Sequence, residues 1–151
     1  MSCAIHARGL TFGYAAGRAV LAGLDLSVEH GERVAVLGPN GAGKTTLMLH
    51  LNALLRASSG SLEVAGLRVG EHDVRDLRAR VGLVFQDPDD QLFMPTVRED
   101  VAFGPLNLGL SRTEVSDRVA LALGAVRMDE LGDRAPHQLS LGQRRRVAIA
   151  T

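Results

Sequence analysis

The chain has 151 residues, of which 46% are hydrophobic and 23% are charged, and a formal net charge of zero at pH 7, values typical of one globular domain without low-complexity segments. Aromatic residues make up only 3% and tryptophan is absent, so a nucleic-acid groove of basic surface and stacking rings has little material. A single cysteine excludes an internal disulfide framework, and no stretch approaches the roughly 20 apolar residues that span a bilayer.

Residues 5–14 and 24–28 predict strands of a small antiparallel layer. A turn at residues 29–32 then leads into Val34-Ala35-Val36-Leu37, a short apolar run typical of a buried strand. Residues 44–55 carry apolar side chains at helical spacing. We therefore expect a strand-to-helix turn between the apolar run and this helix.

That turn fits the phosphate-binding pattern G-x-x-x-x-G-K-[ST] at every fixed position, as Gly38-Pro39-Asn40-Gly41-Ala42-Gly43-Lys44-Thr45. Its glycines allow backbone angles that let several N–H groups surround the phosphates of a nucleotide at the positive end of the helix. The pattern places Lys44 on the β- and γ-phosphates and Thr45 on Mg²⁺. Lys44 is also the only lysine, and its compact ammonium suits such a loop where the broad arginine fork does not.

Residues 61–64 predict another short strand, residues 73–78 a charged helical turn, and residues 81–85 a third buried strand that ends at Gln86-Asp87. An acid after an apolar strand is also typical of the magnesium-positioning strand of P-loop kinases and GTPases, and Asp87 is that acid in this alternative. The GTPase version lacks a lysine for base recognition, because Lys44 is already committed to phosphate.

Beyond Asp87 the pattern predicts a helical subdomain. A capping box at residues 111–114 precedes one apolar helix face, formed by Val115, Val119, Ala122 and Val126. A second box, Ser140-Leu141-Gly142-Gln143, opens a final helix that contains Arg144-Arg145-Arg146. The arginine run is most simply a solvated or subunit-facing side. The start of this helix is either a second anion site or only a structural cap.

Three motifs occur in the order seen in ATP-binding-cassette (ABC) ATPases, which the chain resembles: the phosphate loop, Gln86 after an apolar run, and Leu139-Ser140-Leu141-Gly142-Gln143 before an arginine-rich helix. Residues 84–93, continuing through 95–97 to 100–105, are similar to the energising subunits of energy-coupling-factor importers, above all to the cobalt and nickel uptake branch. The resemblance covers essentially the whole chain. It implies an α/β fold, a P-loop NTPase core with a small antiparallel β layer and a helical subdomain, whose carboxy-terminal strands are missing.

The resemblance also implies a role for each motif. It makes Tyr14 the aromatic that stacks on adenine, and Gln86 the residue that links Mg²⁺ and attacking water to a membrane partner. It makes Ser140, Gly142 and Gln143 signature residues that act in trans on ATP held by a second subunit, although Leu141 stands where the family usually has glycine. The implied ATP cradle consists of Gly38, Pro39, Asn40, Gly41, Ala42, Gly43, Lys44, Thr45 and Thr46, with Thr45 and Gln86 contacting Mg²⁺ through ATP.

Residues 89–93 are expected, on the same resemblance, near the groove that receives a coupling helix of a transmembrane subunit. Leu92 and Phe93 would then be exposed anchors. The alternative is that both side chains cover the core of the helical subdomain itself.

The resemblance divides the chain into a nucleotide-binding core over residues 1–87, a helical subdomain over 88–139 and a signature helix over 140–151, together a partial nucleotide-binding domain. In the family, a strand ending in the magnesium-associated aspartate and the catalytic glutamate follows the signature helix, and then a switch histidine. None of these occurs in residues 1–151. We therefore expect the chain to bind Mg-ATP without sustained hydrolysis, and to be marginally stable alone, as a broken gene product or an incomplete reading of a longer one.

The leading expectation is an ATP-binding subunit of an importer for cobalt or nickel. Its partners would be a transmembrane coupling subunit, which holds it at the cytoplasmic face of the membrane, and a second ATPase subunit in a homo- or heterodimer, with no nucleic acid. One alternative is a non-hydrolysing nucleotide-binding module, or a non-functional fragment, that acts only by association. Another is a cassette ATPase of DNA repair, which the neutral charge and scarce aromatics disfavour.

Overall fold

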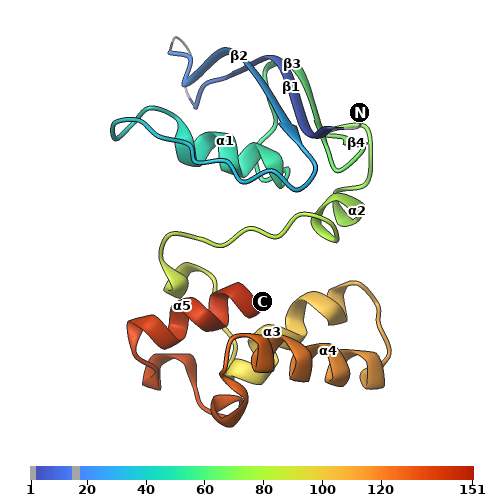
Figure 1. Cartoon of the computed structure of the whole chain (residues 1–151), viewed down its shortest axis with the longest axis vertical. Helices are drawn as coiled ribbons and strands as arrows, with labels where there is room; N and C mark the ends of the chain where they lie inside the picture. Colours follow the sequence, from blue (N-terminus) through green and yellow to red (C-terminus); the bar gives the residue numbers. More distant parts are fainter. Residues whose placement is uncertain (1–2, 15–17) are drawn as a thin grey trace. The chain divides into compact units, whose positions relative to one another are not determined.

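A computed structural model describes residues 3–14 and 18–151 of the chain, which divides into two compact units, Met1–Leu83 and Val84–Thr151. Figure 1 shows a sheet and helix α1 in the first unit and helices α3 to α5 in the second.

The first unit is built on a four-stranded antiparallel sheet in the order β2-β1-β3-β4 (Figure 1). Strand β1 (Cys3–Phe12) lies between β2 (Leu21–Glu29) and β3 (Ser59–Val64), and the short β4 (Leu67–Arg68) pairs with β3. In this register Ala7 of β1 is opposite Leu26 of β2 and Leu62 of β3. The expected antiparallel layer is confirmed, although β1 ends at Phe12, two residues earlier than predicted.

Helix α1 (Lys44–Leu51) packs against this sheet and ends four residues before the predicted limit. Leu47 joins the buried core of the unit, and His50, which is 1% exposed, meets the ring of Phe12 edge to face at 4.7 Å. Nδ1 of His50 lies 2.7 Å from the carbonyl oxygen of Thr46, so this nitrogen carries the hydrogen and donates it. The core of the unit comprises Ala7, Leu10, Leu21, Leu47, Leu62, Val64, Leu67 and Leu77.

Two predicted strands, residues 34–37 and 81–85, do not form strands in the structure. Leu37 is 88% exposed and Val84 is 52% exposed, so neither run is buried as expected. The prediction was wrong because apolar content alone does not make a strand. A strand also needs a neighbour that pairs with its N–H and C=O groups, and none lies beside either run among the residues described.

The charged helical turn predicted between these runs is present as α2 (Val74–Arg78). Its N-cap is Asp73, whose carboxylate accepts a hydrogen bond from the backbone N–H of Arg75 at 2.9 Å. A carboxylate at the start of a helix accepts a hydrogen bond from a free N–H group, and its negative charge interacts favourably with the positive end of the helix dipole.

The second unit, which is described throughout, packs α3 (Val97–Asn107), α4 (Arg112–Ala125) and α5 (Leu141–Ala150) around one core (Figure 1). A short 3₁₀ helix, η1 (Pro88–Asp90), precedes α3, and two more, η2 (Asp129–Leu131) and η3 (Pro136–Gln138), lie between α4 and α5. The predicted helical subdomain is thereby confirmed, as is the apolar face of α4. The core comprises Leu92, Val97, Val101, Val115, Val119, Leu123, Met128, Leu139, Val147 and Ala148.

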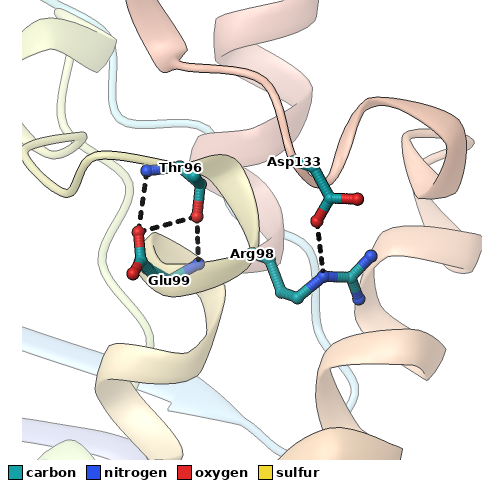
Figure 2. Close-up of polar contacts among 4 residues, drawn as sticks. All are labelled: Thr96, Arg98, Glu99 and Asp133. Atoms are coloured by element: carbon teal, nitrogen blue, oxygen red, sulfur yellow. Dashed lines mark hydrogen bonds and ion pairs between the residues drawn. The ribbon is translucent and has the colours of Figure 1, made fainter.

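Each of these three helices begins with a reciprocal capping box. The sequence predicted the boxes of α4 and α5 and missed the one on α3, although its pattern T-x-x-E was visible. Figure 2 shows this box: the Glu99 carboxylate accepts from the backbone N–H of Thr96 at 3.0 Å and from its hydroxyl at 2.8 Å. Beside it, Arg98 forms an exposed ion pair with Asp133 at 3.1 Å (Figure 2).

Asp100 on α3 is a buried carboxylate, 3% exposed. One of its oxygens accepts hydrogen bonds from the backbone N–H groups of Phe93 and Met94, each at 3.0 Å. The other oxygen has no hydrogen-bond partner. Burial raises the pKa of Asp100 above its ordinary value, and the two backbone donors oppose this shift. Asp100 thus holds the backbone at Phe93 and Met94 in place ahead of α3, although burial of its charged form is unfavourable.

Substitution of Asp100 should separate these two effects. Because its pKa is raised in the folded state, the protonated form stabilises the fold below the ordinary pKa of 3.8, and that contribution is lost as pH rises through the raised value. Asp100→Asn keeps an acceptor without a charge, so its stability relative to wild type should increase between about pH 3 and about pH 7. Asp100→Ala should lower the free energy of unfolding by roughly 2–4 kcal/mol at both pH values, because two buried N–H groups lose their acceptor.

Urea denaturation followed by circular dichroism measures both variants, with Asp117→Asn on the exposed side of α4 as the matched control. A stability difference between Asp100→Asn and wild type that does not change with pH would contradict the assignment.

Candidate functional site

The loop over residues 38–43 leads directly into α1, and its shape requires glycine. Gly41 and Gly43 have φ values of +80° and +89°, in the left-handed region that other residues rarely adopt. A Cβ atom on Gly43 would also lie 3.0 Å from the carbonyl oxygen of Val20. The structure therefore gives a physical reason for glycine at one fixed position of the motif, Gly43, and at the variable position that Gly41 occupies.

The start of α1 differs from the starts of the other described α-helices. Its N-cap, Gly43, provides no side-chain hydrogen bond, and its first turn contains no acidic residue. Helices α2 to α5 each have a side-chain cap, from Asp73, Thr96, Ser111 and Ser140. Free N–H groups and the helix dipole give an uncapped start a partial positive charge. This site is therefore suited to an anion from outside the chain.

Lys44 adds a full positive charge at the same place. Its Nζ donates to the carbonyl oxygens of Gly38 and Pro39, both at 2.8 Å, which holds the ammonium over the loop. Thr45, in the first turn of α1, has an exposed side chain. Backbone N–H groups, an ammonium and a hydroxyl together form the donor set for a polyphosphate that carries Mg²⁺.

A magnesium ion at this site would depend on phosphate ligands. Among residues 3–14 and 18–151, no group of three or more His, Cys, Asp or Glu side chains could hold a metal ion. Mg²⁺ commonly binds through one or two protein oxygens, several waters and the phosphates of a substrate. The hydroxyl of Thr45 fits a Mg²⁺ ion whose other ligands are phosphate oxygens and waters. The described residues do not supply a complete set of protein ligands for the ion.

Tyr14 lies next to the start of α1. Its hydroxyl is 3.2 Å from the hydroxyl oxygen of Thr46, and its ring meets Phe12 edge to face at 5.0 Å. The Tyr14 side chain remains 62% exposed, so it can offer a face to a planar ring. The first unit thus brings together Tyr14 and Thr46, two residues that were predicted to share one ligand.

Gln86 and the signature residues belong to the second unit. Gln86 is exposed, in the segment before η1. Asp87, the acid of the kinase or GTPase alternative, accepts a hydrogen bond from the backbone N–H of Asp89 at 3.0 Å and caps η1. This carboxylate therefore has a local structural role that needs no metal.

The start of α5 is capped in an unusual way. Ser140 accepts from the N–H of Gln143 at 3.3 Å, and the Gln143 side chain accepts from the N–H of Ser140 at 2.8 Å. In the boxes of α3 and α4, a glutamate also takes the hydroxyl hydrogen of the cap residue, at 2.8 and 2.6 Å. The Ser140 hydroxyl donates no such bond, and the space over Gly142 is open. Ser140 can therefore donate to an anion without losing its cap.

Leu92 and Phe93, for which the sequence left two alternatives open, differ in exposure. Leu92 is 8% exposed and packs in the core of the second unit, so the prediction of an exposed anchor was wrong for it. Phe93 is 63% exposed and pairs edge to face with Phe103, which is 40% exposed, at 5.0 Å. We call Phe93 and Phe103 the aromatic patch.

Comparison with known proteins identifies relatives of the whole chain. The ABC transporter family pattern matches residues 21–151. The chain is 54% identical over 97% of its length to the energy-coupling factor transporter ATP-binding protein EcfA of Methanothermobacter thermautotrophicus, and covers 48% of that protein. It is 53% identical over 99% of its length to the cobalt import ATP-binding protein CbiO of Rhodobacter capsulatus, and covers 54% of it. The chain thus spans about half the length of these curated relatives.

A solved structure agrees with these matches. CbiO1 of Clostridium perfringens, described as part of the ABC transporter complex CbiONQ, superposes with a TM-score of 0.85 at 38% identity, over 99% of this chain and 61% of that one. The expected α/β architecture, with its antiparallel layer and helical subdomain, is thereby confirmed. Within the described residues, no helix has both the length and the apolar character needed to cross a membrane.

The glycine requirement of the loop can be tested directly. Gly43→Ala should lower the free energy of unfolding of the first unit by about 1–3 kcal/mol, because the left-handed conformation and the nearby Val20 carbonyl both oppose a Cβ atom. Gly82→Ala is the control, since its backbone is not left-handed and nothing lies within 4 Å of the added atom. Equal urea midpoints for the two variants would count against the described loop.

Proposed function

Because the chain belongs to the ABC transporter family, we propose that it is the nucleotide-binding part of an ATP-binding subunit of an energy-coupling-factor importer. The observation that carries this proposal is the uncapped start of α1, with Lys44 held over the loop. The names of the EcfA and CbiO relatives support the class of importer, and the cobalt import relative supports cobalt, one of the two ions expected, as the transported ion.

The described residues would bind ATP through three kinds of contact. The N–H groups of the loop and of the first turn of α1 surround the phosphates, and the Lys44 ammonium lies against the β- and γ-phosphates. Tyr14 stacks on the adenine ring. Thr45 holds Mg²⁺ together with the phosphates, and this ion neutralises negative charge on the phosphate oxygens when bound. Gln86 acts at the same nucleotide, and links it to the membrane partner.

The start of α5 serves a different nucleotide. We assign Ser140, Gly142 and Gln143 to the γ-phosphate of ATP held by a second ATPase subunit, identical or related to this one. The unused hydroxyl hydrogen of Ser140 and the open space over Gly142 support this assignment. Leu141, where the family usually has glycine, is 48% exposed and does not belong to the buried core of the second unit.

Substitution of Lys44 tests the phosphate site. Lys44→Ala should weaken Mg-ATP binding by about tenfold to a hundredfold, because a charge-assisted hydrogen bond to phosphate is lost. Lys44→Arg should also bind weakly, since a planar guanidinium does not fit where a compact ammonium is held. Isothermal titration calorimetry gives both affinities, and exposed Arg112→Lys on α4 is the control. If Lys44→Arg bound Mg-ATP with wild-type affinity, this result would argue against a loop that encloses the phosphates.

A partner distinguishes the proposed function from a second candidate. This second candidate is a non-hydrolysing nucleotide-binding module that acts by association. Both would bind Mg-ATP, and only the proposed importer subunit has a transmembrane coupling subunit as its partner.

The aromatic patch is the surface on which that partner would dock. Paired exposed aromatic side chains are typical anchors for an apolar helix. Docking there would hold the chain at the cytoplasmic face of the membrane through its partner.

Phe93→Ser should reduce capture of the detergent-solubilised transmembrane coupling subunit by about tenfold or more, as expected for loss of one anchor. Leu121→Ser removes a side chain that is 74% exposed on α4 and serves as the control for general loss of apolar surface. Nucleotide affinity should not change in either variant. Equal capture by the two variants would place the partner elsewhere.

A further inference from the structure

Gln91 joins two segments that the proposed function uses separately. Its side-chain oxygen accepts a hydrogen bond from the backbone N–H of Phe85 at 3.0 Å, immediately before Gln86. Its side-chain nitrogen donates to the carbonyl oxygen of Ala148 at 2.7 Å and to the hydroxyl of Thr151 at 2.6 Å. Every polar hydrogen and the oxygen of this amide are therefore engaged. One side chain connects the Gln86 segment to the end of α5.

A second connection ties the same segment to the first half of α5. Arg144 forms an ion pair with Asp89 at 3.0 Å, and the Arg144 side chain is only 21% exposed. Arg144 also donates to the carbonyl oxygen of Leu139, one residue before Ser140, at 2.8 Å. On either side of Gln91, Pro88 and Leu92 are buried. Residues 85–92 therefore lie along α5, attached near both of its ends.

The chemistry at position 91 is specific for an amide. A glutamate could still accept from Phe85, but it has no hydrogen to donate, and its charge would face the carbonyl oxygen of Ala148. A methionine would keep the length of the side chain and lose every hydrogen bond. A glutamine is the residue that accepts from one segment and donates to the other.

We propose that Gln91 is a positioning residue that couples the backbone at Gln86 to the signature helix α5. A displacement of Gln86 moves Phe85, and the Gln91 amide transmits that displacement to α5 and its Ser140 end. The connection itself rests on the hydrogen bonds above. Its use in nucleotide sensing rests on the proposed function, because Gln86 must respond to Mg-ATP for a signal to exist.

Amide hydrogen exchange tests the connection without nucleotide. In Gln91→Met the amide of Phe85 should exchange about tenfold faster than in wild type, because its acceptor is gone. Asp90→Asn is the control, since Asp90 is the exposed neighbour of Gln91 in η1. Unchanged exchange at Phe85 in Gln91→Met would overturn the proposed connection.

A second measurement tests transmission, with Mg²⁺ and adenylyl imidodiphosphate as the probe and with the chain monomeric by light scattering. In wild type and Asp90→Asn, the probe should slow exchange at residues 85–87 and at residues 140–144. In Gln91→Met and Gln91→Glu, probe affinity and the response at 85–87 should be retained, while the response at 140–144 falls by about fivefold or more. A merely structural role would not separate these two responses.

A wild-type response at 140–144 in both Gln91 variants would overturn the coupling. Absence of probe binding to wild type would instead refute the proposed function. In that case the nucleotide-free exchange at Phe85 would still support or overturn the link between Phe85 and α5.

Discussion

A backbone segment remains a strand only where a neighbouring strand satisfies its N–H and C=O groups, and the first unit follows from this constraint. Strand β1 has partners on both sides, and the resulting sheet supplies the surface against which Leu47 and His50 of α1 pack. With α1 fixed on the sheet, the loop before it has a defined geometry, in which Gly43 lies under the Val20 carbonyl. The proposed phosphate site is thus positioned by antiparallel pairing elsewhere in the same unit.

Local signals in the sequence were reliable because their partners lie within a few residues. Three predicted features depend on backbone angles or N–H groups close by: the glycines of the loop, the boxes at Ser111 and Ser140, and the helical turn over residues 73–78. The runs at 34–37 and 81–85 were predicted wrongly because strand pairing depends on distant segments that apolar content does not reveal.

Leu92 and Gln91 illustrate the same limit in the second unit. Burial of Leu92 depends on how three helices pack, so the sequence could not separate it from the exposed Phe93 next to it. The bonds of Gln91 to Ala148 and Thr151 span 57 and 60 positions. No spacing rule links residues so far apart, and a glutamine in an acidic stretch gives no sign of such partners.

The cap of α5 has a consequence for how two chains would associate. A glutamine at position 143, where the boxes of α3 and α4 have glutamate, leaves the positive end of the helix dipole without a compensating charge. The loop before α1 is also positive, through Lys44 and its free N–H groups. In the proposed pair of ATPase subunits, these two positive surfaces would face each other and would repel until a polyanion lies between them. Nucleotide binding would therefore precede assembly of the pair.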